Sequence, residues 1–322
     1  MSVLIFAESN NGKFNKATLE VASYAKEIAN TLGTSVTAVA INASETEELA
    51  MYGVDKLLTV TNSSLENFNA RAYADVVKQA AEKEGANLVI MTSTNDGKYL
   101  APLVAGNLNA GFASNVIALP ESTAPFTVKR TAFSNKAFNI TEISSDNKVI
   151  ALAKNAFGLK EHNGSTTQEN FDATINDAHL GTTVTAVDKA TGQVTIADAE
   201  IVVSAGRGLK GPENWGMVEE LAGVLGAATA CSKPVSDLGW RPHSEHVGQT
   251  GKPVASNLYI AIGISGAIQH LAGINASKVK VVINTDPEAP FFKAADYGIV
   301  GDAFEVVPTL IEKLKAFKAQ NA

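Results

Sequence analysis

Cysteine is almost absent from this sequence, since Cys231 is the only one among 322 residues. Neither an internal disulfide nor a cysteine-based metal cluster can therefore form, and we expect no bound metal. A chain without disulfides suits a reducing compartment, so a cytoplasmic location is expected for a bacterial protein. No signal or transit peptide is expected, because Met1-Ser2-Val3 runs directly into an apolar stretch that predicts a strand.

Positive charge and long apolar runs are also scarce. Lysine and arginine together number 26 against 33 acidic residues, which gives a formal net charge of −7. Nonspecific binding of nucleic acid needs a basic surface, so this class of partner is not expected. Charged residues or glycines interrupt the apolar runs well short of the roughly 18 residues that a membrane span needs, and we expect no membrane insertion.

The chain has enough material for two domains. It exceeds the roughly 100–200 residues of a typical domain, and 45% of its residues are hydrophobic. In the first part, apolar runs of strand length alternate with amphipathic runs of helix length. The predicted strands are residues 3–7, 35–41, 56–60 and 87–91, and the predicted helices are residues 16–32, 71–84 and 98–108. This alternation predicts an α/β fold with a parallel sheet covered on both faces.

The sequence that follows loses its helical period. Three short runs predict antiparallel strands added to the sheet, at residues 126–132, 137–143 and 148–153. Residues 160–179 are polar and predict a connecting loop. Residues 182–187 and 193–196, around a turn at Ala190-Thr191-Gly192, predict a hairpin.

The domain boundary is placed near Asp188, which gives an N-terminal α/β scaffold domain of residues 1–188 and a second domain of residues 189–322. We expect the first domain to bind no ligand, because no Gly-x-Gly-x-x-Gly follows its first strand. Asn10-Asn11-Gly12 and Thr94-Asn95-Asp96-Gly97 predict turns. Phosphate binding is the alternative for the second of these turns.

Strands and helices alternate again in the second domain, which predicts a doubly wound parallel sheet. The predicted strands are residues 201–205, 227–231, 258–264, 278–283 and 297–300. Ligands of such sheets bind at the carboxyl ends of the strands. Arg207 follows the first strand, and Ser232-Lys233 follow the second. Arg207 suits a phosphate, for which its guanidinium is a two-pronged donor, and an ion pair at a helix end is the alternative.

Two polar segments lie at the centre of this domain. Val247-Gly248-Gln249-Thr250-Gly251 combines glycines, which permit close backbone approach, with uncharged donors and acceptors. Ser265-Gly266-Ala267-Ile268-Gln269-His270 follows an apolar strand and is predicted to open a helix. With Ser265 as the N-cap, the N–H groups of Gly266 and Ala267 would form an anion site suited to a pyrophosphate.

These segments resemble the α subunit of electron transfer flavoproteins. The resemblance rests on Gly248-Gln249-Thr250-Gly251-Lys252, on Leu258-Tyr259-Ile260-Ala261 and on Gly263-Ile264-Ser265-Gly266-Ala267-Ile268-Gln269-His270, followed by Asn284-Thr285-Asp286-Pro287. It runs without a gap from about residue 205 to 307, and the N-terminal part resembles the same family more loosely. Several ordered motifs make it more specific than a single glycine fingerprint.

The resemblance implies that the second domain binds FAD. Val247 to Thr250 would line the flavin, with the Thr250 hydroxyl beside a ring nitrogen. Residues 265–270 would hold the pyrophosphate and ribityl region, with His270 near the pyrimidine carbonyls. The implied cofactor-binding set is Arg207, Ser232, Lys233, Val247, Gly248, Gln249, Thr250, Ser265, Gly266, Ala267, Ile268, Gln269, His270, Asn284, Asp302 and Ala303. Besides Arg207, two of these have an alternative role: His270 as a helix histidine bonded to backbone, and Asp302 as a cap of the last helix.

The sequence departs from the family at one position of this set. The family usually has arginine over the isoalloxazine ring, where this chain has Lys233. The positive charge is kept, but the planar fork that can stack on a ring is lost. Lys233 is therefore predicted to tune the flavin's reduction potential, and Lys233→Arg is predicted to change that potential.

By resemblance the protein is an electron carrier without a substrate of its own. It would pair with a β subunit, take electrons from flavoprotein dehydrogenases such as the acyl-CoA dehydrogenases of fatty acid β-oxidation, and pass them to a quinone oxidoreductase or another acceptor. A eukaryotic form would belong in the mitochondrial matrix. Whether β carries AMP or a second FAD, and whether the complex bifurcates electrons, is not encoded in this chain.

Three alternatives remain open at this stage. The fold also suits a flavin- or nicotinamide-dependent oxidoreductase with its own substrate, or a module that senses adenine nucleotides. His243 and His246 could suggest a metal site, but no cluster of ligands completes it, and loop histidines are the simpler interpretation.

Overall fold

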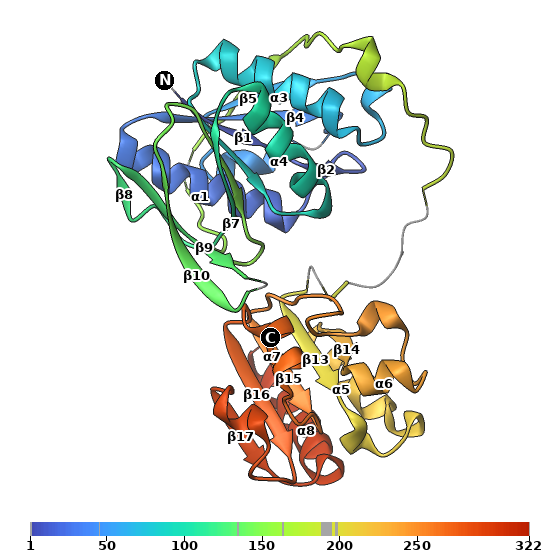
Figure 1. Cartoon of the computed structure of the whole chain (residues 1–322). Helices are drawn as coiled ribbons and strands as arrows, with labels where there is room; N and C mark the ends of the chain where they lie inside the picture. Colours follow the sequence, from blue (N-terminus) through green and yellow to red (C-terminus); the bar gives the residue numbers. More distant parts are fainter. Residues whose placement is uncertain are drawn as a thin grey trace. The chain divides into compact units, whose positions relative to one another are not determined.

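The computed structural model describes residues 2–44, 46–133, 135–162, 164–187, 195–196 and 199–321. The chain divides into two compact units, one of Met1–Ala132 with Ala137–Asp188 and one of Phe133–Lys136 with Lys189–Ala322 (Figure 1). Both units are α/β, which confirms the predicted fold class. The predicted boundary at Asp188 and the predicted turn at 190–192 lie outside the described residues.

The first unit is built on a mostly parallel sheet with the strand order β10-β9-β7-β11-β6-β1-β4-β5-β12, and β8 pairs with β9. A separate small hairpin is formed by β2 and β3. The strands are β1 (Ser2–Phe6), β2 (Ser9–Asn10), β3 (Lys13–Phe14), β4 (Ser35–Ile41), β5 (Lys56–Val60), β6 (Leu88–Thr92), β7 (Gly111–Val116), β8 (Ser122–Thr123), β9 (Phe126–Ala132), β10 (Ala137–Ile143), β11 (Lys148–Leu152) and β12 (Thr167–Asn170). The helices are α1 (Lys16–Leu32), α2 (Glu48–Met51), α3 (Ala70–Glu84) and α4 (Asn95–Asn107).

Local signals in the sequence explain where the long helices of this unit begin and end. The side chain of Asn15 accepts a hydrogen bond from the Thr18 N–H at the start of α1, and Gly33 ends the helix with φ +65°. Asn69 caps α3 in the same way, and Gly85 ends it with φ +59°. These are the caps expected from side-chain acceptors at the amino end and left-handed glycine at the carboxyl end. Helix α1 packs on one face of the sheet, and α3 and α4 pack on the other.

Four predictions for this unit are wrong. Residues 95–97 of the predicted turn at 94–97 belong to α4, where the Thr94 hydroxyl caps the helix by accepting a hydrogen bond from the Gly97 N–H. Strand β11 was expected to be antiparallel, but it lies parallel between β6 and β7. Four of its five residues are buried, as is typical of a central strand. Strand β12 lies within the predicted loop of residues 160–179, where its polar residues extend the sheet edge beside β5. Residues 182–187 form no strand.

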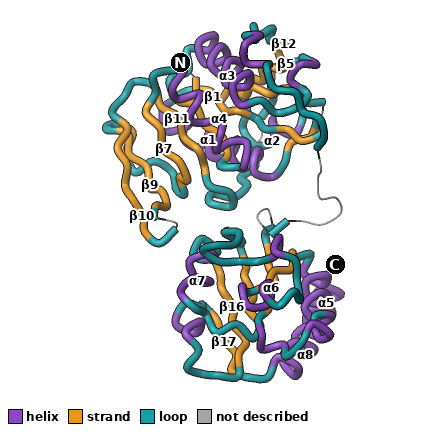
Figure 2. Tube along the Cα trace, turned by 45° about the vertical axis from the view of Figure 1, so that its right-hand side comes forward, coloured by secondary structure: helices purple, strands orange, loops and turns teal. Residues whose placement is uncertain are grey.

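The second unit has an all-parallel sheet in the order β14-β13-β15-β16-β17. Its strands are β13 (Ile201–Ala205), β14 (Ala228–Cys231), β15 (Leu258–Ile262), β16 (Val279–Asn284) and β17 (Tyr297–Val300), and its helices are α5 (Gly216–Leu225), α6 (Lys233–Asp237), α7 (Ile268–Ile274) and α8 (Ala303–Asn321). Figure 2 shows the strands between α5 and α8 on one side and α7 on the other. The predicted doubly wound sheet is confirmed.

The strand order of the second unit determines where a ligand can bind. From β13 the chain first adds β14 on one side and then returns to add β15 on the other side. The loops after β13 and β15 therefore leave the sheet in opposite directions, which opens a crevice at the carboxyl ends of these strands. The sequence predicted a ligand at the carboxyl edge of this sheet, and the strand order selects this point along that edge.

Among the described residues, no helix combines the length and the apolar composition that crossing a membrane requires.

Candidate functional site

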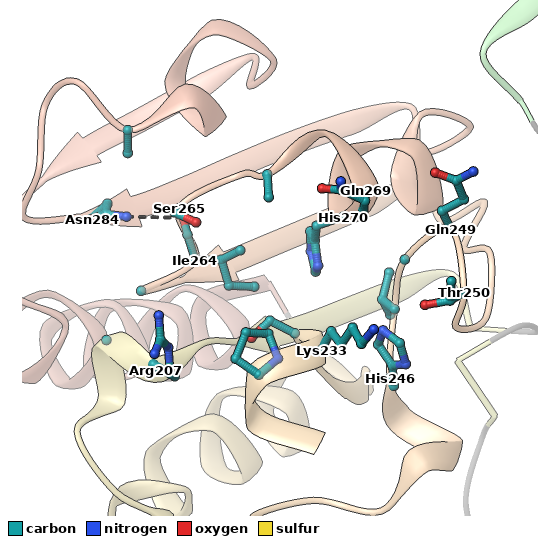
Figure 3. A pocket seen from close by; sticks show the side chains of 18 of the residues that line it. Arg207, Lys233, His246, Gln249, Thr250, Ile264, Ser265, Gln269, His270 and Asn284 are labelled. Atoms are coloured by element: carbon teal, nitrogen blue, oxygen red, sulfur yellow. Dashed lines mark hydrogen bonds between the residues drawn. The ribbon is translucent and has the colours of Figure 1, made fainter. Parts of the chain in front are cut away.

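A cavity of about 540 Å³ lies at the switch point of the second unit, within the range of volumes usual for ligand sites (Figure 3). Loops that follow β13, β14, β15 and β16 form its walls, together with the segment around Gly248. Twelve of the predicted site residues line it: Arg207, Ser232, Lys233, Val247, Gly248, Gln249, Thr250, Ser265, Ala267, Gln269, His270 and Asn284. The fold thus brings together residues up to 77 positions apart in the sequence, from 207 to 284.

The remaining four predicted residues lie outside this lining. Ile268 is 73% exposed at the start of α7, and Gly266 turns the preceding loop with φ +84°. The Asp302 carboxylate caps α8 by accepting a hydrogen bond from the Phe304 N–H at 3.0 Å, and Ala303 is buried in the core beneath that helix. Contact of these four with a cofactor stays a prediction.

Seven residues of the lining were not predicted: Gly208, Pro234, His246, Gly263, Ile264, Asp286 and Ala289. Several of them directly follow strands, next to residues that were predicted. Extending each predicted site by one or two residues at the carboxyl ends of the strands would have found Gly208, Pro234, Gly263, Ile264 and Asp286, because neighbouring residues in these loops line the same crevice.

A pair of glycines brings two of the loops into backbone contact. Gly263, just after β15, has φ +60°, and a Cβ atom there would lie 2.7 Å from the Gly208 Cα. A Cβ atom on Gly208 would lie 2.6 Å from the Gly263 Cα in turn. The Gly208 N–H donates a hydrogen bond to the Gly263 carbonyl at 3.1 Å. Only residues without a side chain permit this approach, and both glycines line the cavity.

The loop before α7 differs from the prediction. Ser265 is not the N-cap, because the helix begins at Ile268 and Ala267 holds the cap position without a side-chain hydrogen bond. Other loops hold this segment instead: the Asn284 side chain donates to the Ile264 carbonyl at 3.1 Å, and the Phe291 N–H donates to the Ser265 carbonyl at 3.1 Å. Within the described chain, the N–H groups of residues 265–267 have no hydrogen-bond partner. A ligand with several acceptor oxygens would satisfy them.

The charges around the cavity also favour an anionic ligand. Arg207 and Lys233 are both exposed to solvent and line the cavity, against one carboxylate in the lining, that of Asp286. Arg207 belongs to the turn after β13 and Lys233 is the first residue of α6. Cations at the mouth of a crevice attract a phosphate and keep a water-exposed route for its entry.

Two buried histidines add uncharged polar groups to the lining of the cavity. His270 is 7% exposed, and its Nε2 lies 2.9 Å from the Tyr259 hydroxyl. His246 is 2% exposed and its ring lies 5.1 Å from that of His243. Within the described residues, the Nδ1 atoms of His246 and His270 have no hydrogen-bond partner. Buried polar atoms are seldom left unpaired, so a bound group is the expected partner.

Both rings are neutral at pH 7. Burial lowers the pKa of His270 to about 4, with His246 adding to the decrease and the Val247 backbone opposing it. Burial also lowers the pKa of His246, with the neighbouring His243 and Lys233 adding to the decrease. Figure 3 shows the Lys233 side chain extended toward the His246 ring. No group of three or more histidine, cysteine, aspartate or glutamate side chains is placed to hold a metal ion in the described chain.

The low pKa of His270 predicts how stability depends on pH. Its ordinary value is 6.5, so between pH 6.5 and about 4 the unfolded chain binds a proton that the folded chain does not. The stabilising contribution is therefore complete above pH 6.5 and is lost as the pH falls through this window. The loss reaches at most about 3 kcal/mol.

Chemical denaturation of the wild type and of His270→Gln, at pH 7 and at pH 4.5, measures this loss. We expect the wild type to lose about 2–3 kcal/mol more than the variant between the two pH values. The difference between the two proteins should not change with pH above 7. Parallel losses in both proteins between pH 7 and 4.5 would show that His270 does not carry this dependence.

Comparisons with known proteins show which family the chain resembles. A family model described as "Electron transfer flavoprotein domain" matches residues 3–178, and one described as "Electron transfer flavoprotein FAD-binding domain" matches residues 195–275. Three curated relatives named "Electron transfer flavoprotein subunit alpha" come from Bacillus subtilis (38% identical, covering 97% of this chain and 97% of the relative), Thermoanaerobacterium thermosaccharolyticum (35%, 98% and 98%) and Pseudomonas aeruginosa (36%, 96% and 99%). The part of the cavity lining from Arg207 to His270 lies inside the second matched segment.

Proposed function

The chain belongs to the α-subunit family of electron transfer flavoproteins, and from this premise we propose that it carries FAD in the cavity between Arg207 and His270. The cofactor supplies the redox chemistry, since its ring accepts and releases electrons. The chain supplies binding, orientation and electrostatics. The observation that carries the proposal is a cavity at a parallel-sheet switch point, most of whose lining residues lie in the segment that matches the FAD-binding family model.

The donor set of the cavity fits a dinucleotide in two parts. The unpaired N–H groups of Ser265 and Ala267 and the guanidinium of Arg207 suit the acceptor oxygens of a pyrophosphate. The neutral groups suit a ring with carbonyl and nitrogen atoms: the side chains of Gln249 and Thr250, and the Nδ1 of His270. We assign the first group to the phosphates and the second to the isoalloxazine ring.

Electron carriage needs a second subunit and external partners. We propose a heterodimer with a β subunit, because the relatives are named as one subunit of an electron transfer flavoprotein. Donors would be flavoprotein dehydrogenases, such as the acyl-CoA dehydrogenases, and the acceptor a quinone oxidoreductase. We further propose that the chain transforms no substrate of its own and works in the cytoplasm of a bacterium.

Co-expression with the β subunit tests the function. The purified complex should be yellow, and stepwise reduction should bleach its visible spectrum reversibly. A donor dehydrogenase with its substrate should reduce it, and a quinone-linked acceptor should reoxidise it. Steady turnover of NADH or a small substrate by this chain alone would instead support an oxidoreductase, and adenine nucleotide bound without a flavin spectrum would support a nucleotide sensor.

Lys233 is expected to raise the reduction potential of the bound cofactor through its charge. Its exposed ammonium lines the cavity, and a positive charge there favours the electron-rich form of the ring. Lys233→Met should lower the potential by some tens of millivolts, where about 60 mV corresponds to tenfold for one electron. Lys233→Arg keeps the charge, so it should shift the potential less than Lys233→Met does. The remaining shift would come from the planar guanidinium group, whose donors are arranged differently from those of an ammonium group.

Redox titration of the complex measures these shifts. Lys278→Met is a matched control, because Lys278 is exposed and precedes β16, at the edge of the sheet opposite the cavity. It should leave the potential unchanged. Identical potentials in the wild type, Lys233→Met and Lys233→Arg would remove Lys233 from the tuning of the cofactor.

A further inference from the structure

Tyr259 contacts a residue of the cavity lining, His270, without lining the cavity itself. It lies on β15 with 0% of its surface exposed, in the core between the sheet and α7, and it does not line the cavity. Its hydroxyl lies 2.9 Å from Nε2 of His270, which does line the cavity. Figure 3 shows the His270 imidazole pointing from α7 into the cavity. Tyr259 can therefore act on a ligand only through His270.

The direction of this hydrogen bond follows from the protons available. Burial raises the pKa of Tyr259, so the phenol keeps its proton, although the nearby Ser204 hydroxyl opposes the change. A buried hydroxyl proton without an acceptor is costly. Ser204 lies on the adjacent strand, but its Oγ forms no hydrogen bond of good geometry within the described residues. Nε2 of His270 is the acceptor that remains for the phenol.

A neutral imidazole carries one proton, on one of its two nitrogens. If Nε2 accepts from Tyr259, the proton of His270 must be on Nδ1. Nδ1 is buried and makes no hydrogen bond of good geometry within the described residues, and the Val247 backbone is close enough to favour a proton on the ring. The hydrogen bond on one side of the ring thus determines what the other side can offer, as is common for histidines held by a neighbouring group.

The surrounding packing holds this pair in place. The Phe291 ring lies parallel to that of Tyr259, with the centroids 6.5 Å apart, and 6.1 Å from that of His270. The centroids of Tyr259 and His270 are 6.0 Å apart. All three residues are buried. A ring enclosed in this way cannot turn over to exchange its nitrogens without displacing its neighbours.

We propose that Tyr259 is the positioning residue that fixes His270 as the neutral tautomer protonated on Nδ1, so that the imidazole meets the bound cofactor as a hydrogen-bond donor. The group that it recognises is an acceptor such as a ring carbonyl oxygen. The part of the inference that concerns a cofactor rests on the proposed function. The tautomer itself depends only on the contacts of the chain.

Nitrogen-15 NMR of the side chains tests the proposal. The full chain is labelled with ¹⁵N-histidine and measured in its complex, and proton–nitrogen correlations show which nitrogen of each imidazole carries the proton. The sequence has five histidines, and the signals lost in His270→Gln assign His270. We expect the proton on Nδ1 in the wild type. Tyr259→Phe should shift the tautomer ratio toward Nε2 by about tenfold, which is the effect of losing one typical hydrogen bond.

Two further variants are controls. Tyr24→Phe makes the same chemical change at another fully buried tyrosine, whose hydroxyl donates to the Ala118 carbonyl at 2.9 Å in the first unit. It should leave the tautomer of His270 unchanged. Ser204→Ala should also leave it unchanged, and a shift there would overturn the proposal because the phenol would then be donating to Ser204.

The remaining outcomes are decisive as well. A wild-type His270 protonated on Nε2 overturns the proposal, even if Tyr259→Phe does not fold. An unchanged ratio in a folded Tyr259→Phe overturns it too. If the complex holds no FAD, the proposed function fails, while the tautomer measured in the cofactor-free chain still decides the role of Tyr259. In the loaded complex, Tyr259→Phe should also change the reduction potential, which Tyr24→Phe should not.

Discussion

Gly263→Ala is expected to strip most of the FAD from the purified complex. The residue has φ +60°, which costs an alanine about 1–2 kcal/mol. In addition, the new Cβ would lie 2.7 Å from the Gly208 Cα, so the loops after β13 and β15 must move apart. Forcing atoms into a packed contact costs about 1–3 kcal/mol more. Both loops line the cavity, so their separation removes the geometry that the cofactor needs.

Gly226→Ala is the matched control for this prediction. Gly226 ends α5 in the same unit with φ +67°, but a Cβ atom there would meet nothing within 4 Å. This variant should lose only the free energy that the left-handed backbone conformation costs an alanine, and the complex should keep its FAD. Flavin absorbance per protein, together with the unfolding free energy, separates the two effects. Equal FAD contents in the two variants would show that the loop contact does not shape the site.

Phe291→Ala is expected to lower the unfolding free energy of the second unit by about 3–5 kcal/mol, the usual cost of removing a buried phenylalanine. Phe291 is 0% exposed and packs against Tyr259 and His270. A void at Phe291 therefore loosens the residues behind the cavity as well as the core.

Tryptophan fluorescence during denaturation follows this unit selectively. The sequence has two tryptophans, Trp215 and Trp240, and both belong to the core on the α5 and α8 side of the second sheet. Phe317→Ala is the control, because this side chain of α8 is 63% exposed and its removal should cost less than about 1 kcal/mol. A loss in Phe291→Ala no larger than in Phe317→Ala would contradict the packing described here.

Much of the secondary structure could be predicted because the responsible signals are local. Helix α1 and strands β4, β5, β9, β10, β13 and β17 have the predicted bounds. For α1, the signals are an amphipathic period, an asparagine cap and a terminal glycine in the left-handed conformation. For the buried strands, they are runs of apolar residues between polar turns. Neither kind of signal depends on the rest of the fold.

The wrong predictions concern segments whose structure depends on contacts with residues far away in the sequence. β11 was assigned to an antiparallel group because it follows β9 and β10, but the chain returns it to the middle of the sheet. β12 has the polar sequence Thr-Gln-Glu-Asn and forms a strand because the edge of β5 offers it hydrogen-bond partners. Ser265 failed as an N-cap because the loop around it is held by Asn284 and by the Phe291 N–H, both remote in the sequence.

The sequence by itself determined the α/β fold class and the polar segments that resemble a flavin-binding family, and it predicted the sheet edge along which the cavity lies. Only the tertiary structure decided that the second sheet has the order β14-β13-β15-β16-β17, that Gly208 meets Gly263, and that Tyr259 stands behind His270. The reason is physical. Periodicity shows which face of an element is buried, because burial acts on each residue separately. The partner of a buried group depends on the arrangement of strands far apart in the chain, and no local pattern records it.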